Sequence, residues 1–327
     1  MHDFVAIGDT VVDAFIKLSA ATVEGVPDAP DYKICLPFAD KVPYESVTVV
    51  PAVGNAANAA VSAARLGLKT AFVTNIGDDE EGKECFASLQ NNGVAEDYVK
   101  VNAGMKTNYH YVLWYGDERT ILTKHEVYPY ELPTFETKWI YFSSVSGEAP
   151  TFHDKVAEYL EAHPEVKFAF EPGKNEIKLG LEKLARFYRR SDIFFCNVDE
   201  AEKILGIYTL GTKELLKRMQ ALGPKIVVIT DGPKGAYAYD GVNMYEQAPY
   251  PDPKPPYDRT GAGDAFSSTT VAALALGKDL STALRWGAVN SMSVVQEVGA
   301  QKGLLTREKI EEFLQKAPAE FQTKKLS

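Results

Sequence analysis

The residues with the clearest potential for chemistry lie between Asp258 and Phe266, where the sequence reads Asp-Arg-Thr-Gly-Ala-Gly-Asp-Ala-Phe. Glycine has no Cβ, so Gly261 and Gly263 can adopt positive φ and let a ligand approach the backbone closely. If the alanine-rich run that follows is a helix, its first amides have no helical partner and can bind a phosphate. Asp264 stands where that helix would begin. It is either an N-cap or a carboxylate placed beside an anion site, and the motif alone leaves both open.

A second group of polar residues opens the small-residue run from Gly54 to Gly67. Its composition favours a helix, and the terminal glycine is typical of a helix end. Asn55 can cap this helix, and Asn58 follows about one turn later. Two amides at a helix entrance can also donate and accept hydrogen bonds toward ligand hydroxyls, so capping and ligand binding are both open.

Two further acidic positions follow expected strands. The apolar run from Phe4 to Gly8 predicts a first strand, and Asp13 lies just beyond its end. Asn197 and Glu200 follow another apolar run, either as an N-cap with an acid in the first helical turn or as ligand-binding groups. Parallel α/β sheets bind ligands at the carboxyl ends of their strands.

The elements that must position these residues alternate along the chain, which predicts a three-layer αβα fold with a central, mainly parallel sheet. We expect one domain over residues 1–327. The pattern predicts strands at 70–76, 166–170, 192–196 and 225–230, and helices at 80–92, 149–163, 177–190, 280–298 and 306–315.

Two excursions, at about residues 14–50 and 107–123, interrupt this alternation. The second alternates around Gly116 like a hairpin, so the two predict a small separate sheet that acts as a lid. His110 and His125 have no evident acidic or metal partner in the sequence and are expected to be lid or surface residues. Arg119 is either an exposed hairpin arginine or a contact for the phosphate of a sugar phosphate.

Composition excludes several classes of protein. The chain has 327 residues, a formal charge of −10 and no stripe of Lys and Arg, which excludes a nucleic-acid footprint. Three widely spaced cysteines fit reduced thiols better than disulfides or zinc ligands. No leader and no membrane-spanning run is evident, so no membrane association is expected and the predicted location is the cytoplasm.

Two alternative nucleotide motifs fail on spacing. Phe266 stands where a dinucleotide-binding motif needs its third glycine, which argues against an oxidoreductase. The segment 77–84 imitates a P-loop, but Glu84 replaces the hydroxyl residue that should hold magnesium, and acids would face the phosphates.

Taken together, the segments 54–67 and 258–266 and the Asn197/Glu200 pair resemble the ribokinase-like carbohydrate kinases, the phosphofructokinase-B type family. The resemblance runs from about residue 4 to residue 315. It implies the ribokinase fold with a β-sheet lid, and transfer of a phosphoryl group from ATP and Mg²⁺ to a primary hydroxyl of a ribose- or fructose-like sugar. An adenosine-kinase-like nucleoside kinase is the alternative, and a non-catalytic sugar or nucleotide sensor is a further one. By the same resemblance, a homodimer through the lid sheet is expected.

The resemblance also implies roles for individual residues. Asp264 would be the catalytic base, with Gly261, Ala262 and Gly263 as the anion hole. The sugar would bind at Asp13, Gly54, Asn55 and Asn58, and ATP at Asn197, Thr230, Gly232 and Gly235. Glu200 would hold Mg²⁺ through water, and Asp258 and Thr260 would help hold a monovalent cation such as K⁺, together with backbone oxygens near Gly299.

The chain departs from the family pattern at three places. Val53 stands where a first glycine is common, Arg259 where threonine is frequent, and Glu171-Pro172-Gly173 where a different acidic pattern is usual. The first and third lie near segments that shape the sugar and phosphate pockets, so they bear on which substrate is bound.

Overall fold

The structure is a computed structural model that describes residues 1–26, 32–116, 118–145 and 149–326. Its centre is a ten-stranded sheet in the order β16-β15-β14-β13-β12-β11-β10-β1-β6-β7. The pairs from β13 through β7 are parallel, and the pairs from β13 through β16 are antiparallel. The mainly parallel α/β sheet that the alternation predicts is therefore confirmed.

The strands of this sheet are β1 (His2–Ile7), β6 (Thr70–Gly77), β7 (Val99–Asn102), β10 (Thr137–Phe142), β11 (Lys167–Phe170), β12 (Ile193–Asn197), β13 (Ile226–Thr230), β14 (Ala236–Tyr239), β15 (Met244–Gln247) and β16 (Lys324–Leu326). The helices are α1 (Asn55–Arg65), α2 (Glu80–Asn91), α3 (Pro150–Ala162), α4 (Lys174–Leu179), α5 (Leu181–Arg190), α6 (Val198–Leu205), α7 (Thr212–Ala221), α8 (Ala262–Ala275), α9 (Leu280–Val294) and α10 (Arg307–Gln315).

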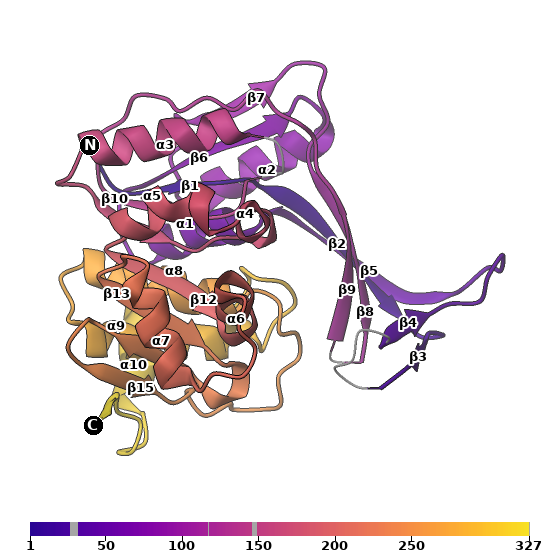
Figure 1. Ribbon diagram of the computed structural model, residues 1–327. Helices are drawn as coiled ribbons and strands as arrows, with labels where there is room; N and C mark the ends of the chain where they lie inside the picture. Colours follow the sequence, from indigo (N-terminus) through magenta and orange to yellow (C-terminus); the bar gives the residue numbers. More distant parts are fainter. Residues whose placement is uncertain (27–31, 117, 146–148, 327) are drawn as a thin grey trace.

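Both faces of the sheet are covered by helices, as Figure 1 shows. Successive strand residues point to opposite faces, so Phe4 and Ala6 enter one core cluster while Val5 and Ile7 enter the other. The first cluster packs against α1, α2, α8, α9 and α10, and the second against α3, α5, α6 and α7. Apolar burial on both faces explains why the central strands are almost continuously hydrophobic.

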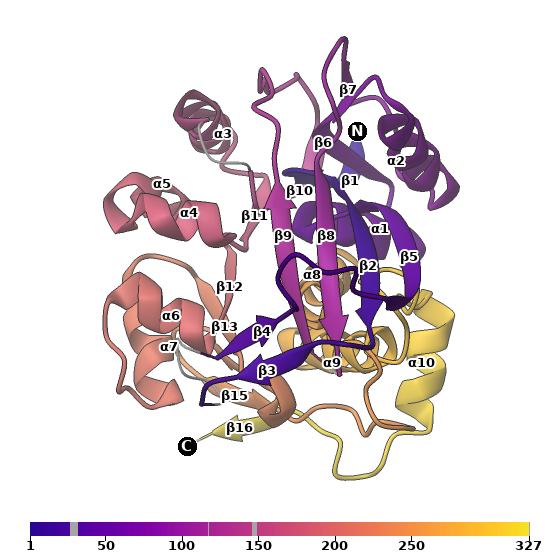
Figure 2. The same cartoon turned by 90° about the vertical axis from the view of Figure 1, so that its right-hand side faces the viewer.

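A separate four-stranded sheet, hereafter the lid sheet, projects from one side of these layers (Figures 1 and 2). It has the order β5-β2-β8-β9 and consists of β2 (Val11–Leu18), β5 (Tyr44–Val53), β8 (Tyr109–Tyr115) and β9 (Glu118–Lys124). The short strands β3 (Thr22–Glu24) and β4 (Lys33–Cys35) pair with each other beside it. The two excursions therefore form the small separate sheet that the sequence predicts.

One predicted helix is wrong in its extent. The segment expected as a single helix over 177–190 is two helices, α4 and α5, that meet at Gly180. Gly180 has a φ of 85°, which a continuous right-handed helix does not allow. Within the described ranges, no helix combines the length and apolar character that crossing a bilayer requires.

Candidate active site

The glycine-rich turn joins the irregular segment after β15 to the first turn of α8. Gly261 is the N-cap of α8 and has a φ of 77°, in the left-handed region. A Cβ built on Gly261 would lie 2.2 Å from the Cβ of Ala300, so a side chain has no room there. The close packing against the Ala300 loop fixes the turn, and the first amides of α8 have no partner within the helix, which is the general basis of anion binding at a helix N-terminus.

Hydrogen bonds to the carboxylate of Asp258 stabilise this turn. Its carboxylate is buried and accepts hydrogen bonds from the amide and hydroxyl of Thr260, at 2.9 and 2.6 Å. It also accepts a bond of 2.8 Å from the amide of Gly299. These three bonds tie the turn to the loop that follows α9, so the contribution of Asp258 to turn geometry is direct.

Asp264 lies in the first turn of α8, and Asn58 of α1 donates a hydrogen bond of 2.7 Å to its Oδ2. Asn58 is 3% exposed, and its own Oδ1 accepts a 3.0 Å bond from Gln301. Burial raises the pKa of Asp264, and the hydrogen bond from Asn58 opposes that shift. A carboxylate with a raised pKa, held by a neutral donor, is suited to accept a proton near neutral pH.

The structure does not show the predicted capping of α1 by Asn55. Gly54 is the N-cap of α1 and makes no side-chain cap, so Asn55 occupies the first helical position and does not cap the helix. Gly54 has a φ of 114°, and a Cβ there would lie 3.2 Å from the carbonyl oxygen of Asp9.

Two further acidic residues lie near Asp264. Glu171 directly follows β11, and Glu200 lies in the first turn of α6, which follows β12. The hydroxyl of Tyr141 donates to Glu171 and lies 2.9 Å from the hydroxyl of Ser267, one turn after Asp264 in α8. Burial and the negative charge of Asp264 raise the pKa of Glu171 to about 8. Burial and the charge of Asp264 also raise the pKa of Glu200. Three acidic groups thus gather at this point of the site, and the burial of Glu171 and Glu200 favours their neutral forms.

The segment after β12 is a capping box. Asn197 Oδ1 accepts from the amide of Glu200 at 2.8 Å, and Glu200 Oε2 accepts from the amide of Asn197 at 2.9 Å. The capping interpretation of this pair is therefore correct. Capping uses one carboxylate oxygen of Glu200, which leaves the other oxygen outside the capping bonds.

Asp13 faces the site from the lid sheet. Its Oδ1 lies 3.2 Å from Nδ1 of His110, whose Nε2 lies 3.2 Å from Nε2 of His125. His125 Nδ1 is 3.9 Å from Oδ2 of Asp9, and the other carboxylate oxygen of Asp9, Oδ1, accepts a 2.8 Å bond from the hydroxyl of Tyr130. Burial lowers the pKa of His125. The expectation that the two histidines lack an acidic partner is wrong, because the register of β2 on β8 places His110 opposite Asp13.

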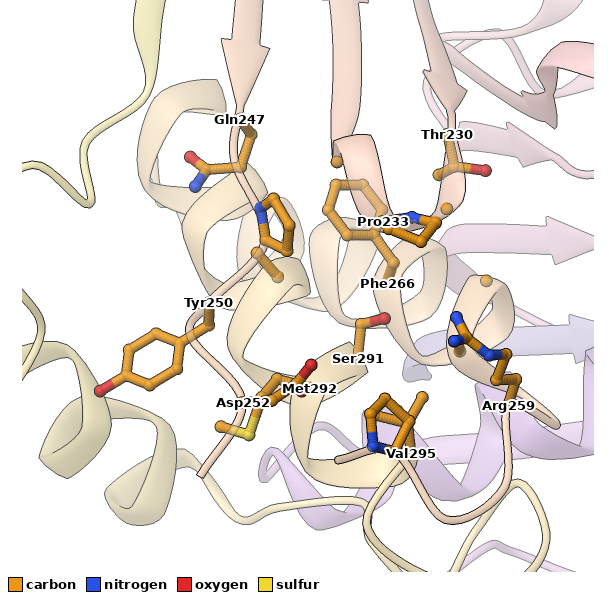
Figure 3. A pocket seen from close by; sticks show the side chains of 17 residues that line it. Thr230, Pro233, Gln247, Tyr250, Asp252, Arg259, Phe266, Ser291, Met292 and Val295 are labelled. Carbon is orange, nitrogen blue, oxygen red and sulfur yellow. The ribbon is translucent and has the colours of Figure 1, made fainter. Parts of the chain in front are cut away.

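A pocket of about 440 Å³ opens on the other side of the glycine-rich turn. Its lining includes Thr230, Gly232 and Gly235 from the end of β13, with Ala262 and Gly263 from α8. In Figure 3, Arg259 lies at one end of this pocket and Tyr250 at the other. Gly235 has a φ of 94°, and a Cβ there would lie 2.2 Å from the carbonyl oxygen of Gln247, so the turn after β13 requires glycine.

The comparisons with known proteins agree with this geometry. A family model described as pfkB family carbohydrate kinase matches residues 23–307. The ribokinase of Bacillus subtilis is 31% identical over 271 residues, which cover 80% of this chain and 87% of that protein. The chain belongs to the pfkB family of carbohydrate kinases. A nucleoside kinase of Methanothermobacter thermautotrophicus is 26% identical over 257 residues, 77% of this chain and 80% of that protein.

The fold agrees as well. The solved ribokinase of Arabidopsis thaliana, complexed with ribose and ATP, aligns with a TM-score of 0.78 at 20% identity and covers 96% of this chain and 98% of that chain. This pfkB kinase is therefore an ATP-dependent phosphotransferase of the sugar and nucleoside kinase group.

Sequence reasoning missed several polar residues of this kinase that surround Asp264. Tyr141, Ser267 and Gln301 carry no motif, and Glu171 was recognised only as a departure from the family pattern. The position of Glu171 directly after β11 was the available signal, because acids at the carboxyl ends of parallel strands face the site.

Proposed function

We propose that the kinase transfers the γ-phosphoryl group of ATP to a primary hydroxyl of a small ribose- or fructose-like sugar, with Asp264 as the general base. One observation carries this proposal. Asp264 stands at the start of α8, between the pocket lined by Gly263 and the lid-sheet face that carries Asp13, and burial raises its pKa. A base at the boundary of two sites can take a proton from an acceptor while the phosphoryl group arrives from the other side.

ATP would occupy the pocket at the end of β13. Thr230, Gly232 and Gly235 line it, and Asn197 lies on the adjacent strand β12. The γ-phosphate would then meet the amides of Gly261, Ala262 and Gly263. In a loose phosphoryl-transfer transition state, positioning and charge compensation dominate, so these amides contribute at least as much as the base.

The acidic residues near Asp264 fit a bound Mg²⁺. Burial, together with the charge of Asp264, raises the pKa of Glu171 and of Glu200, and a bound cation would stabilise their charged forms. The described residues contain no cluster of three His, Cys, Asp or Glu groups able to hold a metal ion. Mg²⁺ keeps several waters and needs only one or two carboxylates, so Glu200 would hold it through water with Glu171 nearby. The ion would neutralise charge on the transferred phosphoryl group.

A monovalent cation such as K⁺ is proposed beside the same turn. The bonds from Thr260 and Gly299 to Asp258 shape a loop whose backbone oxygens could surround such an ion. Asp258 would then act mainly by fixing those oxygens, because its own carboxylate already accepts three bonds.

The acceptor sugar would bind between the entrance of α1 and the lid sheet. Asp13 would grip hydroxyls with its Oδ2, since Oδ1 lies beside His110. Gly54 and Asn55 would line the same side. Asn58 would act chiefly by orienting Asp264, because both of its amide atoms already have partners.

The experiment is a coupled ATP-consumption assay over a panel of sugars and nucleosides, repeated with Asp264→Asn. We expect turnover with the best acceptor to fall roughly 10²- to 10⁴-fold. Asp279→Asn is the matched control, because Asp279 caps α9 through the amide of Thr282 and asparagine caps equally well. Turnover of Asp264→Asn within about threefold of wild type would refute the base assignment. Preference for nucleosides would favour the nucleoside kinase alternative, and binding without turnover would favour a sensor.

A homodimer through the lid sheet is also proposed, with a single domain over residues 1–327. The outer face of the lid sheet exposes apolar side chains on three of its strands: Val47 and Val49, Tyr111, and Leu122. Apolar side chains gathered on one exposed face are typical of an interaction surface.

A further inference from the structure

Arg119 lies on the face of the lid sheet that covers the catalytic turn. In the register of the sheet it stands opposite Trp114, which stands opposite Lys17. Because side chains alternate along a strand, this row shares its face with Asp13 and His110. The ring of Trp114 contacts the ring of Tyr257, next to Asp258, with centroids 5.1 Å apart. The same face of the sheet thus carries Arg119 toward Asp264.

The polar contacts of Arg119 distinguish it from the other cation of its row. Its Nε is shielded from solvent and has no hydrogen-bond partner, and Arg119 forms no ion pair with any residue in the described ranges. Lys17, in the same row, is already paired with Glu45 at 2.7 Å. The positive charge of Arg119 lowers the pKa of Asp264, which places the charge close to the base. A partly buried charge without a partner is costly, so this position is suited to an anionic ligand.

The donor side of the site has its own cationic residue. Arg259 lines the pocket assigned to ATP, whereas Arg119 is not among its lining residues and extends from the same sheet as Asp13. The anion that Arg119 meets therefore lies on the acceptor side. An arginine fork is also well matched to carboxylate and phosphate groups, which it can bind through two parallel bonds.

We infer that Arg119 selects an acidic acceptor, and this inference rests on the proposed function. The acceptor is a small polyol whose carboxylate or phosphate group is separate from the hydroxyl that is phosphorylated. The hydroxyls of this acceptor contact Asp13, its reacting hydroxyl faces Asp264, and its anionic group pairs with Arg119.

Matched acceptors test the inference. Gluconate is compared with sorbitol for the carboxylate, and fructose 6-phosphate with fructose for the phosphate, in wild type and in Arg119→Gln and Arg119→Lys. In wild type we expect kcat/KM to favour one of the two acids over its neutral partner by at least about tenfold. Arg119→Gln should lower kcat/KM for that acid about 100-fold, mainly through KM, and leave the neutral partner within threefold. For the acidic acceptor, kcat/KM of Arg119→Lys should lie between the values of wild type and Arg119→Gln, because lysine keeps the charge and loses the fork.

Lys124→Gln is the control, since Lys124 is exposed at the end of the same strand and pairs with Glu126. This variant also removes one positive charge, and it should leave kcat/KM unchanged for both the acidic and the neutral acceptor. The inference is overturned if wild type prefers neither acid, or if Arg119→Gln lowers kcat equally for acidic and neutral acceptors, which would place Arg119 on the transferred phosphoryl group or on Asp264. Thermal shifts with each acid, without ATP, separate this inference from the proposed function, because an Arg119-dependent shift requires binding only.

Discussion

The packing of Gly261 against Ala300 gives a sharp test of the catalytic turn. In Gly261→Ala, the new Cβ would lie 2.2 Å from the Cβ of Ala300, well inside the roughly 3.5–4.0 Å contact distance of two carbons. The loop or the turn must therefore move by more than about 1 Å. The φ of 77° adds about 1–2 kcal/mol for a residue with a Cβ. With about 1–3 kcal/mol for overpacking, the free energy of unfolding should fall by about 2–5 kcal/mol.

The variant should lose turnover even under conditions where it remains folded. The amides proposed as the anion hole lie on the residues that must move, and a displacement of about 1 Å can cost roughly 10²-fold in rate. Removing one aligned donor costs about 10²- to 10³-fold. We therefore expect kcat of Gly261→Ala to fall at least about 100-fold at a temperature where urea melts show the protein folded.

Gly263→Ala is the matched control two residues later. A Cβ on Gly263 meets no atom within 4 Å, and Gly263 has an ordinary helical φ in α8. Replacing glycine by alanine in a helix adds up to about 1 kcal/mol of stability, so this variant should be as stable as wild type or more so. A loss of turnover without a loss of stability would then come from the methyl group at the pocket proposed for ATP. If Gly261→Ala matches wild type in urea melts and in kcat, the reasoning about the turn is wrong.

Three further predictions follow from the buried polar groups and the lid sheet. Between pH 4.5 and about 8 the unfolded chain has released the proton that folded Glu171 keeps. Without Mg²⁺, the free energy of unfolding should therefore fall as pH rises, by at most about 1.4 kcal/mol per pH unit. Urea melts of Glu171→Gln over the same pH range should lack that part of the decrease. His110→Ala removes the group beside Asp13 and should raise the acceptor KM about tenfold with kcat nearly unchanged, and equal effects on both would contradict a positioning role. Tyr111→Glu on the outer face of the lid sheet should convert a dimer to a monomer in light scattering, whereas Val101→Glu, an equally exposed apolar site on β7, should not.

Local patterns explain what could be predicted. The strand predicted to begin at Thr70 is β6, and the alternation of strands and helices identified the sheet because burial on both faces leaves an apolar signature in the sequence itself. The glycine-rich turn was recognisable for the same reason: Gly261 must tolerate both positive φ and close packing, and only glycine does.

Contacts between distant segments could not be predicted in this way. Tyr141 meets Ser267 across 126 positions of the chain, and neither residue belongs to a motif. His110 meets Asp13 because two excursions pair in one particular register, and a shift by one residue would turn His110 to the other face. The break at Gly180 was not predicted for a different reason: the residues on both sides of Gly180 favour a helix.

The root of the lid sheet and the carboxylate of Asp264 share one hydrogen-bonded path. Ala52, near the end of β5, has a φ of 58° and accepts a 2.6 Å bond from Gln301. Gln301 also donates to Asn58, which donates to Asp264. Because these amides are buried, disturbing one of them leaves a polar atom without a partner, which is costly in a low-dielectric interior. A displacement at the root of the lid sheet therefore changes the groups that hold Asp264, so the orientation of the proposed base depends on the position of the sheet proposed to bind the acceptor.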